Sequence, residues 1–363
     1  MKNYDLYLPS YCVGNNVYLK IKEVCRQYGD KAVVIGGYKG MNAVKEKLDY
    51  AAQDSGIKIL DYVWFGGECT YENVELLTEN PKVIEADYIF AVGGGKALDT
   101  CKCLSQKINK KVFTFPTIAS NCAACTTVSI IYNQDGTFKE PFFFLKPAEH
   151  AFIDTEIICR APKKYMWAGI GDTYSKYYES TVSSRNEELE HFKALGVGFS
   201  HMCLDPLIKY GVKALEDNEK KLESFELEQT VLGIIVTTAV VSILLTRDHT
   251  PDYNSGLAHA VFYALTYYEE IEKHHLHGEV VSLGVLFLLL CDKNEEEFNK
   301  IYEFNKKVGL PVCLDDINIS REQFENIIDR IIEASDVKHY PYKITRDMLY
   351  NAAANLHNMK NKI

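Results

Sequence analysis

One stretch constrains this chain more than any other: an apolar run at 88–92 enters the turn Gly93-Gly94-Gly95-Lys96, and a helix-like stretch leaves it. Three successive glycines let the backbone approach a ligand with no Cβ in the way. The first turn of the following helix has unpaired N–H groups and the positive end of the helix dipole. The stretch therefore predicts a strand, a turn and a phosphate-binding helix N-terminus, although ordinary turns between strand and helix share this composition.

The first part of the chain reads as an α/β domain with a parallel sheet. Short β-rich runs alternate with helix-like stretches, which is the pattern of strands joined by crossover helices. In an open parallel sheet the ligand lies at the carboxyl ends of the strands, where Gly36-Gly37, Gly93 to Lys96 and Pro116-Thr117 fall. The runs are 32–35, 57–65, 88–92, 111–115 and 128–132, and the helix-like stretches are 41–53 and 70–78.

Beyond Ala161-Pro162 the apolar residues recur at helical spacing, so we expect an all-α second domain. We place the two domains at 1–160 and 161–363. The uncharged run 230–245 is shorter than the roughly 20 residues that cross a bilayer, and we expect it to be a buried core helix. The predicted helices are 166–182, 191–210, 226–245, 257–267, 278–290, 295–308 and 321–334.

Composition narrows the class of partner and the compartment. The formal net charge of -10 argues against nucleic acid and anionic membranes as partners. The eleven cysteines are odd in number and scattered, so we expect buried thiols in a reducing cytoplasm. The first residues lack the apolar segment of a signal peptide, which agrees with a cytoplasmic location. Cys122 and Cys125 are separated by two residues, a spacing that suits a redox pair, half of a metal site or the lining of an active site.

Asp172, His259 and His277 form a candidate set of metal ligands in the helical half, suited to zinc or ferrous iron. The two histidines are 18 positions apart, which on one unbroken helix would separate them by about 27 Å. The chain must therefore reverse near 267–273 for them to share an ion. We expect Asp172 to complete the set from a helix that starts just after Gly169 and Gly171.

Another interpretation of these side chains remains open. Three polar residues on helices often serve only as hydrogen-bonding groups. The neighbouring His274 and His275 read as solvated loop residues. Proximity of the three candidate ligands in the structure is therefore the test of the metal hypothesis.

Motifs along nearly the whole chain resemble the group III metal-dependent, iron-containing alcohol dehydrogenases, and in particular their glycerol dehydrogenase branch. These motifs lie at 91–102, 116–120, 169–173, 258–260 and 277–279. Shorter motifs are similar to the hydroxycarboxylate dehydrogenases, NADPH-dependent reductases of 2-oxo acids. They lie at 117–124, 169–176 and 337–342.

The resemblance implies a dinucleotide-binding domain, a helical metal-binding domain, NAD or NADP as cofactor and one divalent metal, zinc or iron. The metal ligands and catalytic residues would be Asp172, His259 and His277. Gly94, Gly95 and Lys96 would bind the pyrophosphate. The residues bordering the ribose and nicotinamide would be Thr117, Ser120, Thr126, Val128 and Tyr132.

The chain departs from the family pattern at three places. Cys122 stands where glycerol dehydrogenases have an aspartate implied to hold a substrate hydroxyl, which makes glycerol doubtful and removes repulsion toward an anionic substrate. Gly37 replaces the acidic residue of NAD-preferring members, and with Lys39 nearby an NADP 2′-phosphate would be tolerated. Many relatives have a second histidine one helical turn after the first metal-binding histidine. Here Phe262 and Tyr263 occupy that turn, which leaves the proton route unassigned.

We therefore expect an oxidoreductase that transfers hydride between NAD(P)(H) and a small 2-oxo or 2-hydroxy acid, acting as a homo-oligomer on a small-molecule substrate. The alternative within the family is glycerol dehydrogenase. A lyase similar to dehydroquinate synthase would need several Lys and Arg side chains for a substrate phosphate, and the motifs are poor in them. A nucleotide-binding protein without catalysis is the remaining reading.

Overall fold

The computed structural model describes residues 4–250 and 252–360. The chain divides into two compact units. The first unit comprises the chain up to residue 163 together with 216–243, and the second comprises 164–215 and the chain from 244 onward. The domain boundaries expected at 1–160 and 161–363 stay a prediction, and in the structure the segment 216–243 belongs with the sheet-containing unit.

The first unit is built on a six-stranded parallel sheet with the order β1-β8-β5-β4-β2-β3. Strand β4 is buried along its whole length, which explains its continuous apolar sequence, because helices cover both faces of such a sheet. The strands are β1 Tyr11–Gly14, β2 Lys31–Gly36, β3 Lys58–Trp64, β4 Tyr88–Gly93, β5 Lys111–Pro116 and β8 His150–Asp154.

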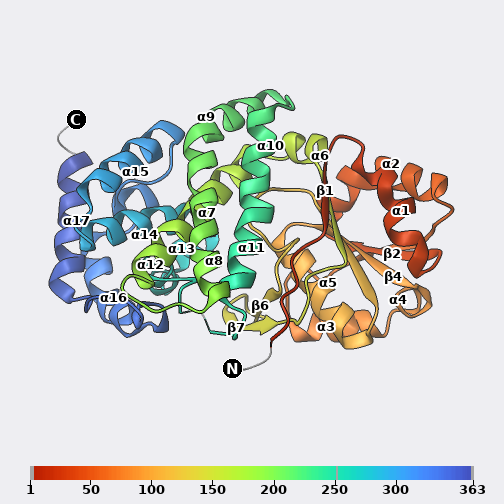
Figure 1. Cartoon of the computed structure of the whole chain (residues 1–363), viewed down its shortest axis with the longest axis horizontal. Helices are drawn as coiled ribbons and strands as arrows, with labels where there is room; N and C mark the ends of the chain where they lie inside the picture. Colours follow the sequence, from red (N-terminus) through yellow and green to blue (C-terminus); the bar gives the residue numbers. More distant parts are fainter. Residues whose placement is uncertain (1–3, 251, 361–363) are drawn as a thin grey trace. The chain divides into compact units, whose positions relative to one another are not determined.

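Helices cover the two faces of this sheet: α1 and α2 lie on one face, and α3, α4 and α5 on the other (Figure 1). Alternate strand residues such as Phe90 and Phe115 form one apolar core with α1 and α2. The helices of this unit are α1 Ile21–Cys25, α2 Tyr38–Asp54, α3 Tyr71–Thr78, α4 Pro81–Glu85, α5 Gly95–Ile108, α6 Thr155–Arg160 and α10 Phe225–Leu232. Helix α11 Thr238–Leu245 also belongs to this unit, except for its last two residues.

The expected strand at 128–132 exists, but it is not part of the parallel sheet. Strand β6 (Val128–Tyr132) pairs antiparallel with β7 (Phe138–Phe143) in a separate two-stranded sheet. The turn 133–137, with Gly136 at φ +88°, joins the two strands as a hairpin. The prediction of a fifth sheet strand was wrong because a β-rich run does not reveal its pairing partner.

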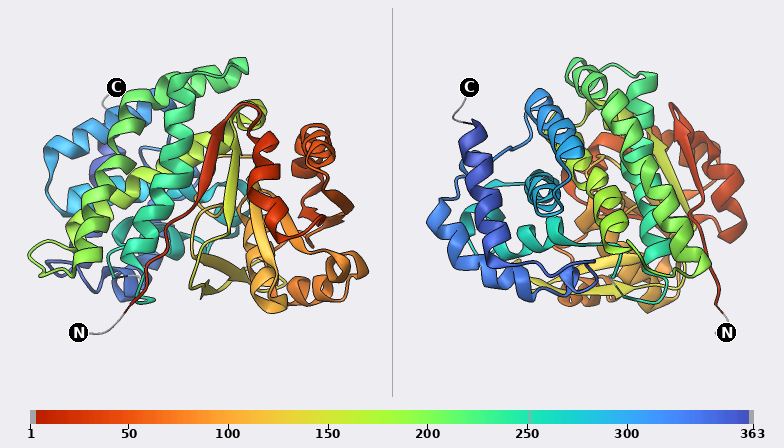
Figure 2. Two further views of the ribbon diagram at one scale, coloured as in Figure 1. Left: turned by 45° about the vertical axis from the view of Figure 1, so that its right-hand side comes forward. Right: turned by 60° about the vertical axis from the view of Figure 1, so that its left-hand side comes forward.

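The second unit contains helices and, among its described residues, no strand (Figure 2). Its central helix α14 is almost entirely buried, which matches its nearly unbroken apolar sequence. The helices are α7 Lys163–Ser183, α8 His191–Phe199, α9 Asp205–Lys220, α12 Leu257–Leu265, α13 Glu269–His274, α14 His277–Cys291, α15 Glu295–Val308, α16 Arg321–Glu333 and α17 Arg346–Lys360, with α7 and α9 each crossing a unit boundary.

The apolar segment Phe225–Leu245 is one helical run of α10, a π-helical turn and α11. By length and composition alone it could cross a membrane, with a mean hydropathy of 1.8. However, 72% of its most apolar window is buried inside the protein. This burial agrees with the expected core helix.

Candidate metal centre and cofactor site

The structure brings together the three predicted metal ligands within the second unit. Asp172 lies on α7, His259 in the first turn of α12, and His277 is the first residue of α14. One ligand atom from each lies within 4.8 Å of the others. The Asp172 Oδ1 atom is 3.5 Å from His259 Nε2 and 3.2 Å from His277 Nε2.

Two glycines explain how Asp172 comes to lie beside His277. A Cβ atom on Gly171 would stand 2.3 Å from the Gly278 carbonyl oxygen, and one on Gly278 would stand 1.9 Å from the Ala168 oxygen. The backbones of α7 and α14 therefore touch, which no residue with a side chain permits. The expectation that Asp172 begins a helix was wrong: it lies in the interior of α7, and the glycine serves helix packing.

The cluster fits a divalent cation. The Asp172 side chain is buried, and its Oδ1 has no hydrogen-bond partner, which is costly for a buried acceptor. Burial alone would raise the pKa of this carboxyl, but the two imidazoles hold it well below its usual range, so it is an ionised ligand. One carboxylate and two imidazoles suit zinc or ferrous iron. The His277 side chain is 42% exposed, so one of the three candidate ligands faces solvent.

Glu179 is the residue of this site that the sequence analysis missed. It follows Asp172 by seven residues on α7, which is two helical turns, so both carboxylates lie on the same face. That spacing is the signal that could have found it. Glu179 Oε2 lies 2.7 Å from His259 Nδ1. Although burial favours the neutral imidazole, the Glu179 carboxylate raises the pKa of His259 to about 9.

The two histidines before His277 differ from each other. His274 ends α13 and is exposed, as expected, although it is helical. The expectation of a solvated His275 was wrong, because its side chain is only 8% exposed and its Nδ1 lies 2.8 Å from Glu279 Oε1. Phe262 packs against His277 with their ring centroids 4.3 Å apart.

The predicted phosphate-binding turn lies in the first unit and has the expected geometry. Gly93 ends β4 with φ +141°, a conformation that favours glycine, and Gly94 caps helix α5. A Cβ atom on Gly94 would lie 2.6 Å from the Ile118 side chain, and one on Gly95 would lie 2.5 Å from that of Asn121. Lys96 follows in the first turn of α5.

The registers of the sheet bring the three predicted loops to one edge. Gly36 of β2 lies opposite Val92, and Gly93 of β4 lies opposite Pro116 of β5. The Thr117 N–H then donates to the Gly93 carbonyl oxygen at 3.0 Å. The expectation that these loops meet at the carboxyl ends of the strands is therefore confirmed.

The remaining predicted cofactor residues all lie in the first unit. Gly37 caps α2, and Lys39 is exposed in the first turn of that helix. Lys96 forms an ion pair with Glu68, and its Nζ lies 5.5 Å from the centre of the Tyr132 ring. Ser120, in the loop between β5 and β6, is partly exposed.

Lys102 joins two further predicted residues and was not itself predicted. This buried lysine donates to Thr126 Oγ1 at 3.1 Å and to the Val128 carbonyl oxygen at 2.6 Å. Its Nζ also lies 3.0 Å from Asp99 Oδ1, one turn earlier on α5. The helix that begins at the glycine turn is thereby tied to the start of the β6–β7 hairpin.

Cys122, the predicted substrate residue, lies in a turn of the loop between β5 and β6. The Cys125 N–H closes this turn by donating to the Cys122 carbonyl oxygen at 3.0 Å. Cys122 is partly exposed, whereas the other cysteines are buried, as expected. Burial raises the pKa of the Cys125 thiol to about 12, which suppresses the thiolate that redox or metal chemistry would need. These observations argue against a redox pair or half of a metal site, and the lining of an active site stays a prediction.

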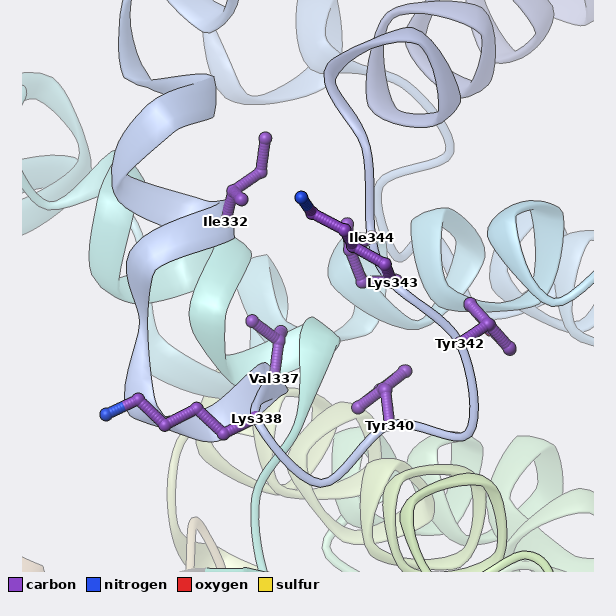
Figure 3. A pocket seen from close by; sticks show the side chains of 7 residues that line it. All are labelled: Ile332, Val337, Lys338, Tyr340, Tyr342, Lys343 and Ile344. Atoms are coloured by element: carbon purple, nitrogen blue, oxygen red, sulfur yellow. The ribbon is translucent and has the colours of Figure 1, made fainter.

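A pocket of about 330 Å³ lies elsewhere in the second unit (Figure 3). None of the predicted site residues lines it. Its wall comes from the end of α16 and the segment that follows: Ile332, Val337, Lys338, Tyr340, Tyr342, Lys343 and Ile344.

Comparisons with known proteins agree with this architecture. Residues 9–155 match the sequence family described as iron-containing alcohol dehydrogenase. A glycerol dehydrogenase of Thermotoga maritima is 30% identical over 88% of this chain and 86% of its own length. Hydroxycarboxylate dehydrogenase A of Escherichia coli is 28% identical, covering 91% of this chain and 90% of its own.

Solved structures show the same fold. The glycerol dehydrogenase of Schizosaccharomyces pombe superimposes with a TM-score of 0.85 at 24% identity, over 100% of this chain and 92% of that one. At this identity the likeness supports the fold alone, whereas the Thermotoga relative carries the family assignment. The chain belongs to the iron-containing alcohol dehydrogenase family, oxidoreductases of alcohol groups whose members use NAD(H) and a divalent metal.

Proposed function

We propose that the chain is a metal-dependent NAD(P)(H) dehydrogenase that interconverts a small polyol and its ketone, with glycerol and dihydroxyacetone as the substrate pair. The observation that carries this proposal is the cluster of Asp172, His259 and His277, with its unsatisfied buried carboxylate oxygen. The choice of substrate is supported by relatives named glycerol dehydrogenase, among them those of Thermotoga maritima and Escherichia coli.

The residues of the chain divide the work of such a reaction. Asp172, His259 and His277 would hold a divalent metal, which when bound would supply Lewis-acid chemistry at a substrate oxygen. The glycine turn before α5 would hold the pyrophosphate of the dinucleotide, whose nicotinamide supplies the hydride. The protein then needs to supply only orientation and electrostatics.

Reduction of a small 2-oxo acid is the second candidate, and Cys122 favours it. The thiol stands where the glycerol dehydrogenase pattern has an aspartate, so this position lacks the charge that would repel a carboxylate substrate. The relative named hydroxycarboxylate dehydrogenase A adds support. The greater number of glycerol dehydrogenases among the relatives places this reading second.

We also propose that NADPH is accepted beside NADH. Gly37 caps α2 directly after β2, at the position where an acidic side chain would bind the ribose 2′-hydroxyl and repel a 2′-phosphate. The exposed Lys39, two residues further on, adds a positive charge to the same helix end. Comparison of the two reduced cofactors in one assay tests this part of the proposal.

The deciding experiment measures kcat/KM for dihydroxyacetone and for 2-oxobutanoate, with NADH and with NADPH, in the zinc-loaded or iron-loaded protein. We expect dihydroxyacetone to be preferred. Cys122→Asp should raise that preference at least about tenfold, or about 1.4 kcal/mol, since the new carboxylate repels the oxo acid. A native preference for 2-oxobutanoate that Cys122→Asp abolishes would establish the second candidate. Turnover of neither substrate would contradict both.

A further inference from the structure

A buried carboxylate lies next to the candidate metal ligands without being one of them. Glu179 is fully buried on α7. Its Oε1 accepts hydrogen bonds from the backbone N–H groups of Gly256, at 2.8 Å, and His259, at 2.9 Å. Its Oε2 lies 2.7 Å from His259 Nδ1. All three partners are therefore on, or directly before, the helix that carries one metal ligand.

The contact with the imidazole ring determines which nitrogen carries the proton. An ionised carboxylate can only accept hydrogen bonds, so the His259 Nδ1 atom must be the donor. The lone pair of a neutral ring then sits on Nε2, the atom that faces Asp172 Oδ1 at 3.5 Å. Metal-bound histidines generally have their other ring nitrogen fixed by an acceptor in this way.

Through its two backbone contacts, Glu179 also fixes the position of the helix turn that carries the ring. Gly256 is the N-cap of α12 and His259 its third residue, and N–H groups at a helix start need acceptors from outside the helix. Another N–H in this turn, that of Leu257, donates to the Tyr340 hydroxyl at 2.8 Å. Tyr340 lies on the segment after α16, beside the pocket of Figure 3.

We propose that Glu179 is the positioning residue of the metal centre: it holds His259 as the Nδ1–H tautomer and so presents Nε2 to a divalent cation. The proposal rests on the metal-dependent function proposed above. Glu179 does not touch the cation or the substrate. It acts through His259, while Tyr340 accepts from a different N–H of the same helix start, that of Leu257.

The variant Glu179→Gln separates the two tasks of this side chain. Its amide oxygen can keep both backbone N–H groups, while its NH₂ group faces His259 Nδ1. The ring must then accept at Nδ1 and carry its proton on Nε2, toward Asp172. We expect the affinity of the metal-free protein for Zn²⁺, measured by competition with a chromophoric chelator, to fall about 10- to 100-fold. At a pH where the His259 ring is neutral, the thermal unfolding of the metal-free protein should change little.

The matched control is Tyr340→Phe, which removes an acceptor from the same helix turn and leaves the imidazole contact intact. It should bind Zn²⁺ like the native protein. Histidine ¹⁵N spectra of the metal-free proteins at a pH where the ring is neutral should show the Nδ1–H tautomer in native and Tyr340→Phe chains, and the Nε2–H tautomer in Glu179→Gln.

Three results would overturn the proposal. Native-like Zn²⁺ affinity in Glu179→Gln is the first, and an equal loss in Tyr340→Phe, which would assign the effect to the helix end, is the second. An unchanged tautomer in Glu179→Gln is the third. If that variant does not fold, Glu179→Asp replaces it, and its carboxylate, shorter by one methylene, should weaken Zn²⁺ binding. A native protein that turns over neither substrate while binding Zn²⁺ would contradict the proposed function and leave the role of Glu179 standing.

Discussion

His259 and His150 show how neighbours set the charge of a buried histidine. His259 faces the Glu179 carboxylate, which outweighs burial and raises its pKa to about 9. His150, on β8, lies 2.7 Å from the Ser10 hydroxyl through Nδ1 and packs against Phe152. Burial, with Lys20 adding to it, lowers the pKa of His150 to about 4. One ring is thus charged in the metal-free protein at neutral pH and the other is neutral.

The neutral state of His150 makes stability depend on pH. Its pKa in the folded protein lies below the ordinary value near 6.5, so the unfolded chain binds the extra proton between these values. Stability from this group is present above pH 6.5 and is lost as the pH falls toward 4. The slope of the unfolding free energy should reach at most about 1.4 kcal/mol per pH unit.

Urea unfolding of native protein and His150→Gln at pH 7, 6 and 5 checks this prediction. The variant should have a flatter pH profile, since Gln does not titrate. His274→Gln, a change at an exposed histidine, is the control and should keep the native slope. Equal slopes in native protein and His150→Gln would show that other groups dominate.

At the scale of elements, α5 links the glycine turn to the β6–β7 hairpin. Lys102 contacts Asp99 on its own helix and two acceptors at the start of β6, and the Ile130 N–H donates to Asp99 Oδ2 at 3.2 Å. A buried charge pair of this kind contributes little net stability over an apolar pair, but removing one partner leaves the other charge uncompensated. The hairpin should therefore depend on Lys102.

We predict that Lys102→Met lowers the unfolding free energy by about 3 kcal/mol and weakens dinucleotide binding. Adding Asp99→Asn should recover part of the stability, because the uncompensated carboxylate is gone. Lys107→Met, a change on α5 that breaks an exposed ion pair with Glu75 of α3, should cost below about 0.5 kcal/mol. Urea midpoints and cofactor titration measure these effects, and equal midpoints for the two lysine variants would contradict the prediction.

Sequence patterns predicted elements better than the pairing between them. Strands β2 to β5 were predicted because they are apolar runs followed by turn residues, whereas β1 and β8 were not. Their short sequences, such as Tyr11–Gly14, carry no such signal, and only pairing with each other and with β5 makes them strands. The site shows the same limit: Asp172 and two histidines were found by residue type, but Gly171 was misread because helix packing is not visible in local sequence.

At the scale of the whole molecule, the candidate metal ligands and the candidate dinucleotide-binding turn lie in separate units. All three metal ligands lie in the second unit, and the glycine turn lies in the first. Binding to the native state stabilises whatever must be folded to form the site, by RT ln(1 + [L]/Kd). Metal and dinucleotide should therefore protect different parts of the chain.

Hydrogen exchange of the metal-loaded protein, before and after addition of a chelator, tests this separation. We expect metal removal to reduce the protection of α7, α12 and α14 and to leave β2, β4 and β5 unchanged. Asp172→Ala, which lacks one ligand, should show no response to the chelator. A loss of protection in the sheet equal to that in α12 would show that the metal stabilises both units together.

The return of residues 216–243 to the first unit has a consequence for the order of folding on the ribosome. The Asn218 side chain donates to the carbonyl oxygens of Ile158, Cys159 and Ala161, at the end of α6, and Glu223 accepts from Asn15 and Thr155. A nascent chain that has emerged as far as residue 163 lacks these partners. Because synthesis adds roughly 5–20 residues per second, the last helical segment of the sheet-containing unit emerges several seconds after residue 163. The first unit therefore cannot complete its fold before part of the second unit has been synthesised.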